Sequence, residues 1–197
     1  FGGNAEDVLY ALQAAQCLGA RAMLAANYRG YGSSPGRPSQ AGLFGGGLQL
    51  FDYVAARDDV DPERIVVMGR SLGSGVATWV AANRPVGGAV LITPYDSIKA
   101  VAQRSFPFLP VGLLLRHPFP SSDYAARVHA PVLMLAAEHD RIVPPVHAQR
   151  LYQAWAGPKQ LHVLAGSEHN DIERHPEYCE RINAFLAVLG QTARVLQ

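Results

Sequence analysis

Cysteine is scarce in this sequence of 197 residues, and the two that occur, Cys17 and Cys179, lie far apart. Such a pair provides neither a multi-disulfide framework nor a Cys-x-x-Cys metal motif. We expect both side chains to be buried thiols in helices, although a disulfide between them stays open. Runs of 18 or more apolar residues are absent as well, which excludes a transmembrane helix within these residues.

Charge is also low and balanced, since charged residues make up 17% of the sequence and the formal net charge is +1. No basic stripe is present, which argues against a nucleic-acid partner. We find no Gly-x-x-x-x-Gly-Lys phosphate loop and no metal-ligand cluster, and therefore expect no cofactor and no metal. The sequence leaves the oligomeric state open.

Hydrophobic residues make up 49% of the sequence, which is enough for one domain over residues 1–197 with a sizeable core. Apolar, β-branched segments alternate with segments of helical period along the chain. This alternation predicts an α/β fold with a mostly parallel sheet covered by helices on both faces. The predicted strands are residues 21–28, 64–69, 87–93, 132–137 and 159–166. The predicted helices are 5–20, 40–57 and 71–83, one after Pro94, one after the prolines at 144–145, and one within 170–190.

The predicted strand 64–69 runs directly into Gly-Arg-Ser-Leu-Gly, residues 69–73, and then into a helix. A strand, Gly-x-Ser-x-Gly and a helix form a nucleophile elbow, in which small flanking residues permit a tight turn and the serine projects above the sheet. The helix N-terminus favours a developing oxyanion there. Alternatively, Ser71 only caps a helix in a glycine-rich turn.

A catalytic serine needs a base and a group that orients the base. Asp140 follows the predicted strand 132–137 and His169 follows the next strand, in the order serine, acid, histidine. Both therefore fall at the carboxyl edge of the predicted parallel sheet, where such sheets place their chemistry. The rival acids are Asp96, after the strand 87–93, and Glu138; we favour Asp140.

Five segments together resemble the α/β-hydrolase superfamily: "GGNA" at 2–5, "NYRGYGSSPGRPS" at 27–39, "GRSLG" at 69–73, "DRIVP" at 140–144 and "GSEHND" at 166–171. The chain is most similar to small serine hydrolases that include the serine aminopeptidase group and membrane-associated depalmitoylase relatives. The resemblance implies that Ser71 is the nucleophile, Asp140 the acid and His169 the base. It also implies that the backbone N–H groups of Asn4 and Leu72 form the oxyanion hole.

The resemblance also bears on the two least regular parts of the chain. In the family the Gly-Gly-Asn loop follows the third strand, so we expect upstream strands in the natural protein; a strand pair or a partner chain filling the gap is the alternative. Residue 1 is Phe, so an upstream signal or anchor would not be visible, and location stays open with the cytoplasm favoured. A short cap is expected at about 98–124. Its apolar residues either line an acyl site or pack on the core: Phe106, Phe108, Leu109, Val111, Leu113, Leu114 and Leu115.

These residues predict a serine hydrolase that cleaves carboxylic esters or thioesters of small molecules through an acyl-enzyme. Peptidase or perhydrolase use of the same triad is an alternative. So is a non-catalytic scaffold of the same fold that binds a ligand or a protein.

Overall fold

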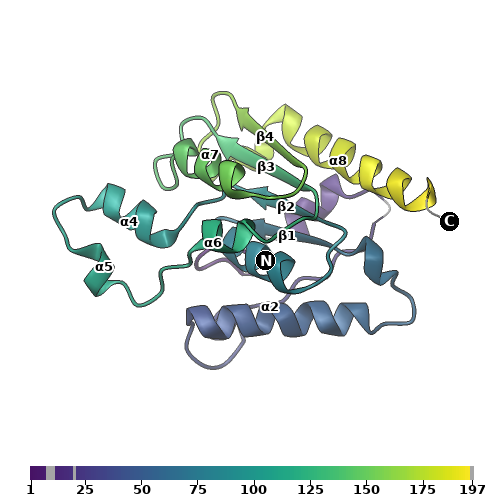
Figure 1. Ribbon diagram of the computed structural model, residues 1–197, viewed down its shortest axis with the longest axis horizontal. Coiled ribbons are helices and arrows are strands. Elements are labelled where there is room, and N and C mark those ends of the chain that lie inside the picture. Colours follow the sequence, from purple (N-terminus) through teal and green to yellow (C-terminus); the bar gives the residue numbers. More distant parts are fainter. Residues whose placement is uncertain (8–11, 20, 196–197) are drawn as a thin grey trace.

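The structure is a computed structural model that describes residues 1–7, 12–19 and 21–195. Its centre is a four-stranded parallel sheet with strand order β1-β2-β3-β4 (Figure 1). The strands are β1 (Val66–Arg70), β2 (Gly88–Ile92), β3 (Val132–Ala137) and β4 (Lys159–Leu164). In this register Met68 pairs with Val90, and Val90 pairs with Leu133. Because the strands are parallel, the loops that follow them gather at one edge of the sheet.

The two central strands, β2 and β3, are buried at every residue, as expected for apolar strands covered on both faces. Leu91 and Met134 belong to the core on one face, whereas Val90 and Leu133 belong to the core on the other. Successive side chains of a strand point to opposite faces, so the uniformly apolar sequence of β2 and β3 supplies both cores.

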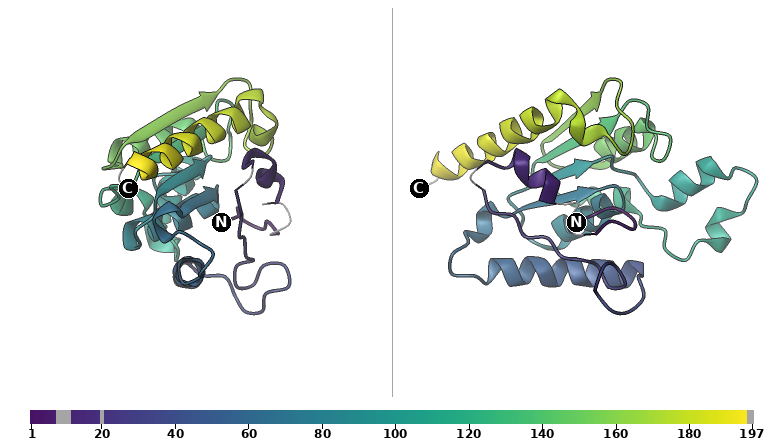
Figure 2. Two further views of the ribbon diagram at one scale, coloured as in Figure 1. Left: turned by 90° about the vertical axis from the view of Figure 1, so that its right-hand side faces the viewer. Right: turned by 180° about the vertical axis from the view of Figure 1, so that it is seen from behind.

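Helices cover both faces of the sheet (Figure 2). On one face α2 (Gln40–Ala55), α3 (Leu72–Asn83) and α7 (Pro145–Ala154) contribute Phe51, Val80 and Leu151 to the core. On the other face α8 (Pro176–Val195) contributes Ile182 and Phe185. The predicted α/β architecture is therefore confirmed. The remaining elements are α4 (Ile98–Ser105), α5 (Val111–Leu114), α6 (Ser121–Ala125) and the short 3-10 helices η1 (Leu12–Cys17), η2 (Pro62–Arg64) and η3 (Ile172–Arg174).

The N-terminal region differs from its prediction. Residues 21–28 form no strand, and Leu24 is 52% exposed. A strand needs a hydrogen-bonding neighbour, and β1 instead bonds Phe1, whose amino group donates to Met68 O (2.7 Å) and whose carbonyl accepts from the Arg70 N–H (3.0 Å). The predicted helix 5–20 is reduced to η1 among the described residues; its residues 8–11 and 20 lie outside them. The expectation of upstream strands stays a prediction.

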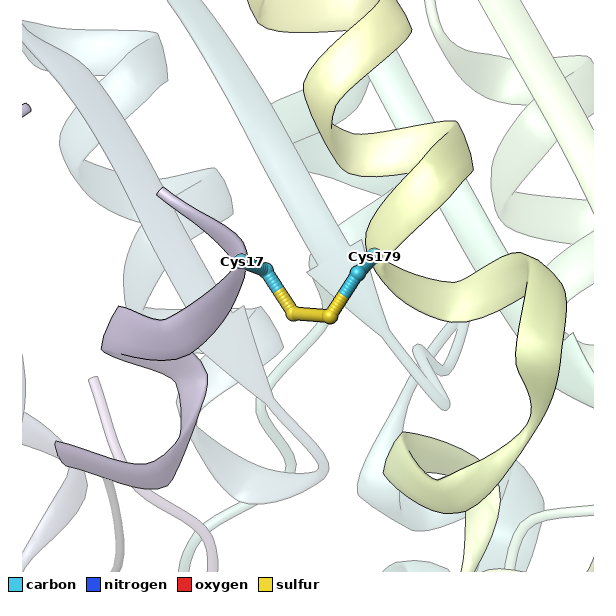
Figure 3. Close-up of a disulfide and its surroundings, with 2 residues drawn as sticks. All are labelled: Cys17 and Cys179. Carbon is cyan, nitrogen blue, oxygen red and sulfur yellow. A yellow bond between two sulfur atoms is a disulfide. The ribbon is translucent and has the colours of Figure 1, made fainter. Parts of the chain in front are cut away.

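The two cysteines form a disulfide, so the expectation of two thiols is wrong. Figure 3 shows Cys17, at the end of η1, bonded to Cys179 in α8. The two residues are separated by 162 positions, and only the packing of η1 onto the α8 face of the sheet brings them together. The bond therefore fastens the N-terminal region to the last helix.

The segment 98–120, which we call the arm, contains α4 and α5 and projects away from the sheet (Figure 1). For most of its apolar residues, the alternative that they pack on the core is wrong. Val111 is buried and Leu115 is partly buried, but the rest are exposed: Phe106, Phe108, Leu109, Leu113 and Leu114. In the described part of the chain, the helices are too short or too polar to cross a membrane.

Candidate active site

Ser71 lies in the tight turn between β1 and α3, with φ 50° and ψ −118°. A positive φ is strained for a residue with a Cβ atom, and such strain is found where structure holds a functional group in place. A Cβ at Gly69 would lie 2.2 Å from Gly73 O, and one at Gly73 would lie 2.2 Å from Phe1 O. Glycine at both positions therefore lets the strand, the helix and the N-terminal segment approach closely around the serine.

Three side chains from the carboxyl edge of the sheet form one continuous chain of hydrogen bonds. His169 Nε2 lies 3.0 Å from Ser71 Oγ, and His169 Nδ1 lies 2.6 Å from Asp140 Oδ2. Asp140 and His169 are buried, whereas Ser71 is partly exposed. In serine hydrolases a nucleophile, a base and a carboxylate that orients the base are hydrogen-bonded in this order. The structure thus brings together the three residues that the sequence singled out.

The turn after β3 fixes the Asp140 carboxylate. Its second oxygen, Oδ1, accepts hydrogen bonds from the N–H groups of Ile142 (2.9 Å) and Val143 (2.7 Å). Backbone donors of this kind prevent the carboxylate from rotating. The carboxylate that faces His169 is therefore held by its own loop.

Of the two expected oxyanion donors, Leu72 lies in the elbow itself and Asn4 lies in the N-terminal segment. Leu72 is the first residue of α3, so its N–H has no acceptor within that helix. Asn4 belongs to the N-terminal segment, which reaches the elbow at Gly73. The hydroxyl of Tyr28 donates to Gly2 O (3.1 Å), and that of Tyr31 donates to Asn4 Oδ1 (2.7 Å). These bonds hold the segment that carries Asn4.

Arg70 connects the same loops, and the sequence analysis gave it no role. Its guanidinium donates to His169 O (2.9 Å) and to Asn170 Oδ1 (3.2 Å), and it forms an ion pair with Glu6. Burial lowers the pKa of Arg70, although nearby acidic groups oppose that effect. The one signal in the sequence was its place inside the elbow motif, because its partners are up to 100 residues away.

The rival acids have other partners. Asp96 Oδ1 lies 2.7 Å from His147 Nδ1 and accepts from Ser97 N–H (2.9 Å), while Oδ2 lies 3.5 Å from Arg150. Burial raises the pKa of Asp96, but the bond to His147 and the other partners outweigh it, so the pKa is lowered overall. Glu138 accepts from the Gly166 N–H (2.8 Å). Neither carboxylate contacts His169 in the described residues.

A cleft of about 540 Å³ lies beside Asp140, between the arm and the loop after β3. Arg104 and Ser105 of the arm line it together with Asp140. A larger cavity of about 740 Å³ lies along β1 and α8 and is lined by none of the three hydrogen-bonded residues. Among the described residues, no group of three or more His, Cys, Asp or Glu side chains is placed to hold a metal ion.

Known proteins resemble this chain in sequence and in fold. The model of the dienelactone hydrolase family matches residues 44–185, a range that includes Ser71, Asp140 and His169. An uncharacterized protein of Mycobacterium tuberculosis, Rv2307c, is 42% identical over 170 residues, covering 84% of this chain and 60% of that protein. The α/β-hydrolase domain-containing protein WAV2 of Arabidopsis thaliana is 36% identical over 141 residues, covering 64% of this chain and 46% of its own length. The chain thus spans only part of the curated relatives it matches.

Solved structures show the same fold at lower sequence identity. A monoacylglycerol lipase of Paleococcus ferrophilus is 22% identical with a TM-score of 0.67, and the match covers 95% of this chain and 91% of that one. A hydrolase of Pseudomonas aeruginosa is 18% identical with a TM-score of 0.70, covering 94% and 87% of the two chains. These likenesses confirm the expected α/β-hydrolase fold.

Proposed function

The chain belongs to the dienelactone hydrolase family, and from this premise we propose that it hydrolyses carboxylic ester or thioester bonds through an acyl-enzyme on Ser71. The observation that carries the proposal is the unbroken line of hydrogen bonds from Ser71 Oγ through both nitrogens of His169 to Asp140. The role of each residue follows from its place in this line.

In the first half-reaction Ser71 Oγ attacks the substrate carbonyl carbon, and His169 Nε2 takes the hydroxyl proton. The tetrahedral intermediate carries negative charge on the former carbonyl oxygen. The N–H groups of Leu72 and Asn4 stabilise that charge, and the N-terminus of α3 adds to their effect. His169 then gives its proton to the leaving alcohol or thiol, which leaves an acyl group on Ser71.

In the second half-reaction water attacks the acyl-enzyme, and His169 again takes and returns a proton. Asp140 keeps the Nδ1–H of His169 directed at its own carboxylate, so that Nε2 faces the serine as a proton acceptor. It also stabilises the imidazolium that forms in each half-reaction.

Hydrolysis of p-nitrophenyl acetate and butyrate by the chain and by Ser71→Ala tests the proposal. We expect the variant to lose activity by several powers of ten, because alanine lacks the hydroxyl that would form the acyl-enzyme. Ser33→Ala is the matched control, since Ser33 is exposed and distant in sequence from the elbow. Equal rates for the chain and Ser71→Ala would contradict the proposal.

The same variants separate the alternatives. A non-catalytic scaffold would hydrolyse neither ester, and its Ser71 would not react with a fluorophosphonate. A peptidase would cleave an acyl p-nitroanilide at a rate comparable to that of the matching ester. A perhydrolase would show oxidation that depends on hydrogen peroxide and on a short carboxylic acid.

A further inference from the structure

The arm, residues 98–120, exposes a cluster of large apolar side chains. Phe108 is 97% exposed and Leu113 is 88% exposed, and the same cluster includes Phe106, Leu109 and Leu114. Scattered apolar residues on a surface are ordinary, but a contiguous group on one projecting segment is characteristic of an interaction site. We therefore expect this cluster to contact a binding partner.

The arm has a defined backbone, so these side chains are not exposed merely because the segment is irregular. Ser97 caps α4 by accepting from the Ala100 N–H (3.0 Å). The side-chain amide of Gln103 donates to the carbonyls of Pro107 (3.2 Å) and Leu109 (3.4 Å), which closes the turn at the tip. Val111 is buried, while its neighbours in the turn and α5 face outward.

Both ends of the arm are fastened to the body. The Lys99 N–H donates to Pro118 O (3.3 Å), which joins the start and end of the arm. Phe119, next to it, packs edge-on against Phe44 of α2, with ring centroids 5.2 Å apart. The exposed apolar residues are thus carried on an anchored segment, and Figure 1 shows that this segment projects from the body.

The charge of the arm has one sign. Residues 98–120 contain no Asp or Glu, whereas Lys99, Arg104 and Arg116 are all exposed cations. In the whole sequence acidic and basic residues are nearly equal in number, 16 against 17. The absence of acid from 23 consecutive residues with three cations, read directly from the sequence, therefore distinguishes this segment from the rest.

We propose that the arm is a docking surface for a lipid bilayer that contains anionic lipids. A projecting apolar tip can enter the boundary between headgroups and acyl chains, and nearby cations bind the anionic headgroups. A projecting tip without acidic residues fits such a surface better than it fits a folded protein, whose interfaces need matched polar partners. Because Arg104 also lines the cleft beside Asp140, docking places that cleft next to the membrane.

The test is co-sedimentation with vesicles of phosphatidylcholine alone and of phosphatidylcholine mixed with phosphatidylserine. We expect binding to the mixed vesicles and much weaker binding to phosphatidylcholine. Each cation near an anionic leaflet contributes roughly a fivefold factor. Lys99→Gln/Arg104→Gln/Arg116→Gln should therefore weaken binding roughly a hundredfold. The control Arg37→Gln/Arg127→Gln/Arg174→Gln makes the same change in net charge at exposed sites outside the arm and should bind far better.

The apolar contribution needs its own pair of variants. Phe108→Asp/Leu113→Asp should lower binding by more than about tenfold, because two inserting side chains become charged. The control Tyr53→Asp/Leu24→Asp alters another exposed aromatic residue and another exposed leucine, so it should bind like the unaltered chain. The altered residues of these two variants and of the two triple variants are all exposed. Circular dichroism should therefore show all four variants folded.

Several results would overturn the proposal: no vesicle binding, equal binding with and without phosphatidylserine, or binding that the arm variants leave unchanged. A dimer in light scattering that Phe108→Asp/Leu113→Asp dissociates, without vesicle binding, would identify a second copy as the partner instead. Ser71→Ala should bind vesicles as the unaltered chain does, so this test does not depend on the proposed hydrolysis.

Discussion

Two buried histidines pair with carboxylates that follow strands of the sheet, yet among the described residues only one of the two pairs reaches a serine. His169 Nδ1 lies 2.6 Å from Asp140, and His147 Nδ1 lies 2.7 Å from Asp96. Both imidazoles are at least nine-tenths buried. By distance and burial alone, either pair could serve as the base and acid of a hydrolase.

The difference lies at the second nitrogen. His169 Nε2 is 3.0 Å from Ser71 Oγ, whereas His147 Nε2 is buried without a hydrogen-bond partner among the described residues. Asp96 moreover stands at the base of the arm, and its bond to His147 joins that base to α7. Under the proposed function, the group that faces the second imidazole nitrogen therefore distinguishes a catalytic pair from a structural one.

The largest effect should separate the two histidines. We expect His169→Asn to lower kcat by about 10⁴ or more, because the serine loses its base. His147→Asn should change kcat by less than about tenfold, because His147 contacts none of the reacting groups. Ester hydrolysis by both variants, with circular dichroism to check folding, measures the difference. A similar loss of kcat in both variants would contradict the different roles of the two histidines.

The next effect should separate the two carboxylates. Asp140→Asn should lower kcat by about 10⁴, because an amide can present an N–H to His169 and turn the wrong tautomer toward the serine. Asp96→Asn keeps the shape of the base of the arm and should leave kcat within about tenfold of the unaltered chain. Saturation kinetics with p-nitrophenyl butyrate compare the two. A greater loss from Asp96→Asn would make Asp96 the acid.

A smaller effect concerns the arginines beside each pair. Arg70→Met removes charge-assisted bonds to His169 O and Asn170, and should lower kcat about 10- to 100-fold. Arg150 is more than half exposed and lies 3.5 Å from Asp96, so Arg150→Met should change kcat by less than about threefold. The kcat and KM of both variants test this. If Arg70→Met raised only KM, Arg70 would not position His169.

The smallest effect is on stability against pH. The pKa of Asp96 is lower when folded than when unfolded, so its stabilisation is present above its ordinary pKa near 4 and is lost as pH falls through the folded pKa. Asp96→Asn lacks this contribution. Its Tm should therefore be about 2–4 °C lower near neutral pH, with the gap closing toward acid. Thermal unfolding at several pH values between neutral and about 3 follows the gap; a constant gap would contradict this origin.

Local sequence was enough to predict the centre of the molecule. The strand at 132–137 has the predicted bounds, and the strand, turn and helix around Ser71 follow from an apolar run, two glycines and a helical period. These features are encoded within a few residues. The order of serine, acid and histidine along parallel strands then brought Asp140 and His169 to the same edge.

What local sequence missed depends on distant neighbours. Residues 21–28 have a strand-like composition, but a strand exists only where an edge is free to pair with it. Cys17 and Cys179 meet because η1 packs beside α8, and His147 meets Asp96 across 51 residues. The sequence left open whether the apolar residues of the arm line an acyl site or pack on the core, and only the folded structure shows that most of them are exposed.

The most direct test of the account is fluorophosphonate labelling with identification of the modified peptide by mass spectrometry. We expect one label per chain, on Ser71. His147→Asn should retain this label, whereas His169→Asn should carry almost none at the same reagent concentration. Labelling of another residue, or equal labelling of the two histidine variants, would contradict the claim that the hydrogen bond from the Ser71 hydroxyl to His169 makes Ser71 the nucleophile.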